Sequence, residues 1–157
     1  MNDENINSHM TTQNEIITTR IFESDKETVF KMWSDSQYLA QWWGPKDFKN
    51  TFHQFEFKPG GVWSSTFHSP DGTDYENKNV FVEIIKNELI VFDHFTGHNF
   101  RITAVFEDKK GKTKLTWKMV FESAEEYKKV KSIVAEANEQ NFDRLESLLK
   151  NKININN

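Results

Sequence analysis

The spacing of apolar residues predicts a first strand followed by two short helices. Residues 15–22 are rich in β-branched side chains and predict the strand. Ser24 and Glu27 form a capping box in front of an apolar stripe at helical spacing, which predicts the first helix. A second helix is predicted over residues 36–42, and its end is predicted there because Gly44-Pro45 cannot continue a helix.

After this point the apolar residues repeat with a period of two, which is typical of strands. The pattern predicts six strands, over residues 51–58, 62–68, 75–86, 89–95, 100–107 and 112–121. Turn signals separate several of them, most clearly Pro59-Gly60-Gly61 and Pro70-Asp71-Gly72. Short turns join antiparallel neighbours, so the pattern predicts one antiparallel meander.

The helical period returns over residues 123–150, with Ser123 and Glu126 as a second capping box. An apolar stripe predicts one continuous helix and consists of Tyr127, Val130, Val134, Ala137, Leu145, Leu148 and Leu149. Such a helix is about 40 Å long, at roughly 1.5 Å per residue, and can cross a seven-stranded sheet. The predicted fold class is therefore α+β, with a curved antiparallel sheet of about seven strands around a long C-terminal helix.

The composition predicts one domain and limits its partners. We expect a single domain over residues 15–150, a disordered tail over residues 1–14 and a frayed Asn-rich end over residues 151–157. The polar N-terminal segment does not resemble a signal peptide, so a cytoplasmic location is expected. A net charge of -4 argues against nucleic acid as a partner, and no apolar run is long enough to predict membrane insertion.

Aromatic residues are the compositional exception. The chain has 14 Phe and 5 Trp, and this bulky apolar surface must be buried or must line a cavity. It has no cysteine, which excludes disulfides, thiol chemistry and cysteine metal sites.

Several short motifs follow one another along residues 18–150. They are Val29-Phe30-Lys31-Met32-Trp33, Trp42-Trp43-Gly44-Pro45, Pro59-Gly60-Gly61 with Trp63, Pro70-Asp71-Gly72, Glu83-Ile84 before Glu88-Leu89-Ile90, Thr113 with Leu115, and Leu145. On these motifs the chain resembles the activator of Hsp-90 ATPase homologue-like proteins of the START and Bet v 1-like superfamily. The resemblance implies the helix-grip fold and an apolar cavity between the sheet and the long helix.

The chain also departs from the family pattern. Asn79 stands where members usually carry glycine, Glu56 where they carry aspartate, and Lys58 where they carry arginine. The long helix has Ala137-Asn138 in place of a Gly-Trp pair. Since this helix is one wall of the cavity, the departures predict that the pocket is lined by other side chains than in most family members.

Inward-facing aromatic residues are the main candidates for contact with a ligand. Trp42 and Trp43 either form a lid over the cavity or pack as core, and the aromatic residues of the strands either line a cavity or fill it. Glu83 and Arg101 are expected either to orient a ligand head group or to form a structural ion pair. The candidate ligand-binding residues are Trp42, Trp43, Phe55, Phe57, Trp63, Phe67, Phe81, Glu83, Phe92, Phe100, Arg101 and Trp117.

No metal or other cofactor is predicted. Of the histidines near the sheet, alternation places His68 opposite Phe67 and His53 beside Phe55, so they are not expected to converge on a metal. Asp93 and His94 are strand neighbours that point to opposite faces and cannot act together on one substrate. No motif of a nucleophile, phosphate loop or dinucleotide site is present, so no catalytic residue is assigned.

Three hypotheses for the function follow. The first is a protein that binds a small hydrophobic or amphipathic molecule in the cavity. The second, implied by the resemblance, is a co-chaperone-like protein that modulates the Hsp-90 ATPase, and the third is a cavity-type enzyme that acts on a small apolar substrate. The sequence leaves open whether the protein is a monomer or a homodimer.

Overall fold

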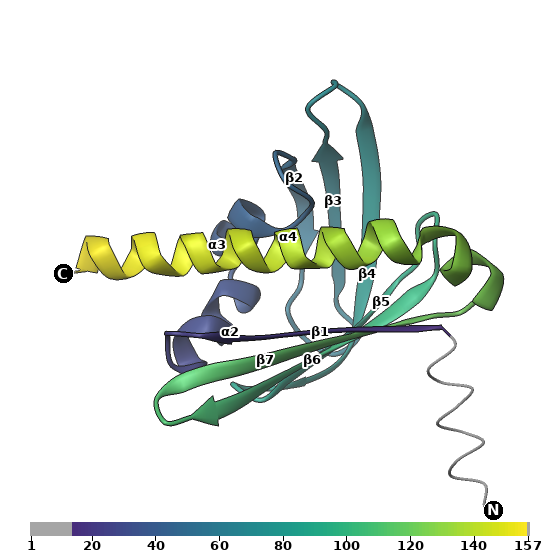
Figure 1. Ribbon diagram of the computed structural model, residues 1–157. Coiled ribbons are helices and arrows are strands. Elements are labelled where there is room, and N and C mark those ends of the chain that lie inside the picture. The colour runs from purple at the N-terminus through teal and green to yellow at the C-terminus, as the bar shows by residue number, and fades with distance from the viewer. Residues whose placement is uncertain (1–13, 157) are drawn as a thin grey trace, which may run out of the picture.

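The structure, a computed structural model, describes residues 14–156 and consists of a curved sheet, two short helices and one long helix (Figure 1). Almost all of the predicted tail over residues 1–14 lies outside the described residues. The elements are β1 (Glu15–Phe22), α2 (Lys26–Ser34), α3 (Ser36–Trp42), β2 (Lys49–Phe55), β3 (Val62–His68), β4 (Asp74–Ile85), β5 (Leu89–His94), β6 (Phe100–Lys109), β7 (Lys112–Phe121) and α4 (Ala124–Asn156).

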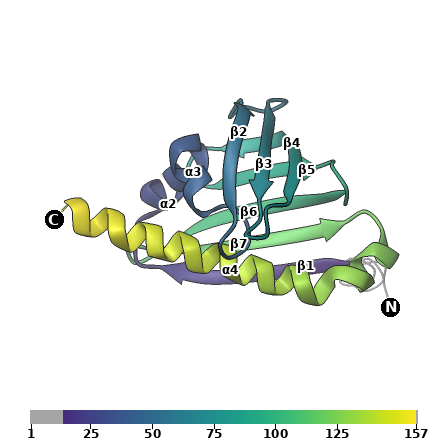
Figure 2. The same cartoon turned by 90° about the horizontal axis from the view of Figure 1, so that it is seen from above.

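The seven strands form one antiparallel sheet in the order β1-β7-β6-β5-β4-β3-β2. The meander from β2 to β7 is confirmed, and β1 is added at its far edge beside β7. In both views α4 runs lengthwise beside β1, while α2 and α3 lie near the C-terminal part of α4 (Figure 2). This is the predicted helix-grip arrangement.

The side chains between the sheet and the helices form a single aromatic-rich core. The inner face of β6 and β7 alternates as predicted, because Ile102, Ala104 and Phe106 are buried together with Leu115, Trp117 and Met119. From α4, Phe142, Leu145 and Leu149 are buried against it. The predicted helical stripe does not include Phe142, although the spacing of Phe142 from Leu145 and Leu149 follows the helical period.

The helix starts are partly as predicted. Helix α4 is capped as expected, since the backbone N–H of Glu126 donates to Ser123 Oγ at 3.2 Å. For α2 the predicted cap is wrong: the N-cap is Asp25, whose carboxylate accepts from Thr28 N at 2.9 Å. Ser24 is instead buried in the turn between β1 and α2. The negative charge of an aspartate at the N-cap also interacts favourably with the positive end of the helix dipole. This explains why Asp25 is preferred over the adjacent serine.

Two bulges interrupt the period of two. The pairing register shifts between Phe52 and Gln54 in β2 and between Phe81 and Glu83 in β4. A bulge inserts one residue and moves the following side chains to the other face of the sheet.

Within residues 14–156, no helix combines the length and the apolar character needed to cross a membrane.

Candidate functional site

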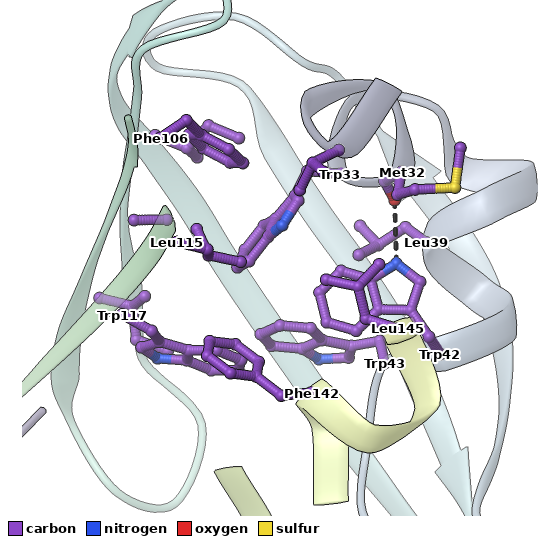
Figure 3. Packing of buried hydrophobic residues seen from close by; sticks show 14 of the residues in the cluster. Met32, Trp33, Leu39, Trp42, Trp43, Phe106, Leu115, Trp117, Phe142 and Leu145 are labelled. Atoms are coloured by element: carbon purple, nitrogen blue, oxygen red, sulfur yellow. Dashed lines mark hydrogen bonds between the residues drawn. The ribbon is translucent and has the colours of Figure 1, made fainter. Parts of the chain in front are cut away.

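The five tryptophans meet in the centre of the core and are called the tryptophan cluster below: Trp33, Trp42, Trp43, Trp63 and Trp117. Figure 3 shows how side chains from α2, α3, α4 and the sheet converge there. Trp43 stacks on Trp117 with ring centroids 5.1 Å apart and an interplanar angle of 7°. The other neighbours pack largely edge to face, an arrangement that aromatic quadrupoles favour. At this place the interior is filled.

The predicted lid residues therefore lie inside the core. Trp42 is fully buried, and its indole N–H donates to Met32 O at 3.0 Å (Figure 3). Trp43 is the most exposed of the five tryptophans, at only 6%. Its ring contacts those of Trp63 and Phe92, with centroids 4.9 and 5.9 Å away.

Three of the buried indole N–H groups have no hydrogen-bond acceptor among the described residues. They belong to Trp33, Trp63 and Trp117, each of which is no more than 2% exposed. A buried donor without an acceptor costs about 1–3 kcal/mol. The tryptophan cluster therefore combines dense packing with unused hydrogen-bonding capacity.

Side chains of α4 hold the loop that carries Trp43, residues 43–46, which we call the lid loop. Arg144 Nη1 donates to the backbone carbonyls of Trp43, Gly44 and Pro45 at 3.3, 2.9 and 3.0 Å. Asn141 Oδ1 accepts from Gly44 N at 2.7 Å. Arg144 and Asn141 are not among the residues that the sequence predicts for the site, because nothing in the helical pattern indicates which loop lies opposite them.

The remaining aromatic candidates divide into two groups. Trp63, Phe81, Phe92 and Trp117 are buried in the core, whereas Phe55, Phe57, Phe67 and Phe100 are only partly buried and pack against it. Phe55 and Phe57 lie at an open groove of about 880 Å³ between α2 and the β4–β5 hairpin, which we call the α2 groove. The groove is lined by Glu27, Phe30, Lys31, Ser34, Asp35, Ser36, Phe55, Phe57, Ile84, Lys86 and Asn87.

The floor of the α2 groove is apolar and continues into the core. Phe57 packs edge to face against Phe30 and Phe81, with ring centroids 5.8 and 5.1 Å apart. Phe30 in turn contacts Phe106 at 5.2 Å. Charged side chains stand at the rim, so the groove has the usual composition of a ligand site, an apolar surface with a few polar groups.

The expected inward pair of Glu83 and Arg101 is wrong. Both side chains are exposed, and Arg101 forms a two-point ion pair with Asp93 on the outer face, at 2.7 and 3.0 Å. For Glu83 the reason is the bulge in β4, which places both Val82 and Glu83 on the outer face. Arg101 faces outward because it alternates with the buried Ile102 in β6. The exposed position of Glu83 removes the basis for assigning it an acid–base role in a cavity.

The histidines are used in separate hydrogen bonds. His53 and His68 both lie on the outer face, where they bond Thr66 and Thr51 at 2.7 Å, and the bulge in β2 explains why His53 does not share the face of Phe55. Among residues 14–156, no three His, Asp or Glu side chains are placed to hold a metal ion together.

His94 differs because it is largely buried. Its ring stacks on Phe100 at 4.4 Å, and Nε2 lies 2.7 Å from Thr96 O. Burial lowers the pKa of His94 to about 4, so the imidazole is neutral at neutral pH. With Nε2 bonded to the Thr96 carbonyl and the ring stacked on Phe100, His94 ties the end of β5 to β6.

Comparison with known protein families identifies the chain. The family model described as activator of Hsp90 ATPase homolog 1-like protein matches residues 23–150. The chain belongs to this family. The sequence-based resemblance is thereby confirmed, while a comparison with curated proteins finds no match.

Several solved structures share the fold. A solution structure from Arthrobacter aurescens has a TM-score of 0.84 and 23% identity, over 90% of this chain and 88% of that one. A crystal structure from Nitrosomonas europaea has a TM-score of 0.82 and 15% identity, over 89% and 96% of the two chains. A family protein from Silicibacter pomeroyi has a TM-score of 0.73 and 19% identity, over 88% and 99%. At these identities the likeness concerns the fold alone.

Proposed function

We propose that this family member binds a small hydrophobic or amphipathic molecule in the α2 groove. The observation that carries the proposal is the partly buried aromatic floor of Phe55 and Phe57, which leaves apolar surface at a concave site. Its volume of about 880 Å³ lies within the range of about 300–1,000 Å³ that small-molecule sites occupy. The cytoplasmic location expected from the sequence stays a prediction.

The charged rim favours an amphipathic ligand over a purely apolar one. Lys31 and Lys86 line the groove together with Glu27, so a polar head group at the rim would meet charges of either sign. An apolar tail would displace water from the phenylalanine floor, which contributes about 25 cal/mol for each Å² buried.

The proposal is tested with native mass spectrometry followed by a binding titration. Freshly purified protein is sprayed gently and then denatured, and a released small molecule would identify the ligand class. Binding of 8-anilinonaphthalene-1-sulfonate, an amphipathic probe, is then measured for the wild type, Phe57→Ser and Phe95→Ser.

We expect Phe57→Ser to weaken probe binding about tenfold or more, because it removes part of the apolar floor. Phe95→Ser is the matched control, since Phe95 is 49% exposed and does not line the α2 groove. Equal affinities for the two variants would contradict binding at this groove.

A second candidate function comes from the family, whose description names an activator of the Hsp90 ATPase. The observation that favours it is the exposed Phe95 beside Arg101 at a second groove, of about 540 Å³. Aromatic and arginine side chains are enriched at protein interfaces. The test is the ATPase rate of purified Hsp90 with added protein: stimulation that Phe95→Ser abolishes supports this function, and an unchanged rate contradicts it.

A further inference from the structure

Three side chains on the outer face of the sheet form a continuous series of hydrogen bonds. His68 Nε2 lies 2.7 Å from Thr51 Oγ1, and His68 Nδ1 lies 2.7 Å from Asp74 Oδ1. A hydroxyl on one ring nitrogen and a carboxylate on the other is the arrangement that activates hydroxyl nucleophiles, and it is recognised by geometry rather than by order in the chain. We call these residues the outer triad: Thr51, His68 and Asp74.

Strand pairing fixes the members of the outer triad relative to one another. His68 of β3 lies directly opposite Asp74 of β4, and it also lies opposite Lys49 of β2, two residues before Thr51. Diagonal neighbours on adjacent strands are within reach of long side chains such as histidine. The three side chains therefore come from three neighbouring strands of one sheet, and a site built on strands is held more precisely than one built on loops.

The carboxylate decides which ring nitrogen of His68 carries the proton. An ionised carboxylate only accepts hydrogen bonds, so the neutral imidazole donates Nδ1–H to Asp74. Nε2 is then the acceptor, and the hydroxyl of Thr51 donates to it. The hydroxyl proton thus already points at the base that can remove it.

A second histidine on the same face offers a comparison within the molecule. His53 Nε2 lies 2.7 Å from Thr66 Oγ1, the same distance as between His68 and Thr51. No carboxylate of the described chain bonds to the other ring nitrogen of His53, so its tautomer is not fixed. The carboxylate of Asp74 is therefore what distinguishes the outer triad from a histidine–threonine contact that only joins two strands.

A lysine beside the outer triad can stabilise negative charge. Lys49 lies directly opposite His68 and on the same face as Thr51. It forms no ion pair with any described residue, whereas Lys78 on this face is paired with Glu76 at 3.1 Å. A positive charge near an attacked carbonyl stabilises the oxygen that becomes negative in the transition state.

We infer that the outer triad is a second functional site, at which Thr51 takes the acyl group of an activated carboxylic ester and passes it to water. Thr51 Oγ1 bonds to the acyl carbon while its proton moves to His68 Nε2. The bond to the leaving alcohol breaks, and the alcohol takes up that proton. Water then attacks the acyl carbon and gives a proton to Nε2, which returns it to Thr51 Oγ1 as the carboxylic acid leaves.

The exposure of the site limits its substrates. Thr51 and Asp74 are exposed, and the side chain of His68 is 38% exposed. Water therefore screens the charge of Lys49, and only esters with a good leaving group are expected to react. The outer triad shares no residue with the α2 groove, so this inference does not depend on ligand binding there.

The test uses 4-nitrophenyl acetate, whose release of nitrophenolate is followed by absorbance. We expect Thr51→Val to lose the catalysed release, and acid-quenched wild-type protein to carry an acetyl group on Thr51 in peptide mass spectrometry. His68→Gln should react about tenfold more slowly, because general-base catalysis contributes on the order of 10²-fold or more in enzymes and less at an open site.

Asp74 acts through His68 and is a positioning residue. Asp74→Asn should lower the rate about tenfold, since an amide can donate to Nδ1 and favour the wrong tautomer. Nitrogen NMR of the imidazole should show the proton of His68 on Nδ1 in the wild type and its partial transfer to Nε2 in Asp74→Asn. An unchanged tautomer together with an unchanged rate would remove Asp74 from the site.

Thr66→Val is the matched control, because it removes the histidine–threonine contact that lacks a carboxylate. It should react at the wild-type rate, and circular dichroism checks that every variant is folded. The inference is overturned if Thr51→Val reacts like the wild type, or if Thr66→Val loses as much activity as Thr51→Val. A wild-type rate no higher than that of free imidazole at the same concentration would overturn it as well.

Discussion

The tryptophan cluster and the α2 groove are adjacent parts of one aromatic core, yet one is filled and the other is open. In the cluster, large indoles from two helices, two strands and the loop after α3 meet, and nearly all of their surface is buried. At the groove, phenylalanines from the edge of the sheet meet a short helix, and their rings stay partly exposed. The difference shows that aromatic content alone does not make a pocket: the shape of the neighbouring elements decides whether rings face each other or face water.

The largest expected effect contrasts the two regions in stability. Trp33→Ala should lower the free energy of unfolding by about 3–5 kcal/mol, because it leaves a cavity among Trp42, Trp43 and Trp117. Phe57→Ala should cost about 1 kcal/mol, since its ring is already partly exposed and water can fill the gap. Urea unfolding of both variants measures this, and similar costs would show that the groove is packed as tightly as the cluster.

The next effect is a dependence of the free energy of unfolding on pH, caused by His94. This histidine lies at the polar border of the core, in the same cross-strand row as Trp63, with Asn79 between them. The pKa of His94 is about 4 in the folded protein, below its ordinary value of 6.5, so the unfolded chain binds more protons between these values. Stability is therefore full above pH 6.5 and falls as the pH drops toward 4, by a total on the order of 2–3 kcal/mol.

Unfolding midpoints between pH 7.5 and 4 test this prediction. The His94→Gln variant should lose this part of the slope because it has no group to titrate. His53→Gln changes an exposed histidine and serves as the control. A wild-type slope that persists in His94→Gln would assign the effect to other groups.

The smallest effect concerns the wall of the α2 groove. Asp25→Ala removes the N-cap of α2 and should cost about 1 kcal/mol, whereas Ser24→Ala should be nearly neutral, because Ser24 Oγ has no partner within the described chain. Since α2 carries Phe30 and Lys31, the loss of the cap should also weaken probe binding at the groove by a few-fold. Thermal unfolding and the same probe titration check both parts.

The fold is predictable from the sequence where local periods decide the structure. The bounds of α3, β3 and β7 are those of the predicted segments, since strong turn signals flank each of them. The long helix continues to Asn156, whereas the sequence predicts that it ends at residue 150.

The candidate site was less predictable because it depends on contacts between distant segments. A bulge in β4 turns the side chain of Glu83 to the face opposite the expected one, and no residue pattern in the strand predicts this bulge. Whether Trp43 lines a space or fills it depends on the lengths and angles of four elements. The role of Arg144 depends on which loop lies across from it, and a single sequence does not contain that information.

The position of β1 has a consequence for synthesis of the protein. The first strand pairs with the last one, from Glu15 opposite Val120 to Phe22 opposite Thr113, and Arg20 binds three carboxylates of α4: Glu139, Asp143 and Glu146. A ribosome releases β1 long before either partner exists, so these contacts form only when nearly the whole chain has emerged. Such long sequence separation slows folding. The nascent chain must therefore keep its isoleucine-rich first strand from aggregating until β7 and α4 are made.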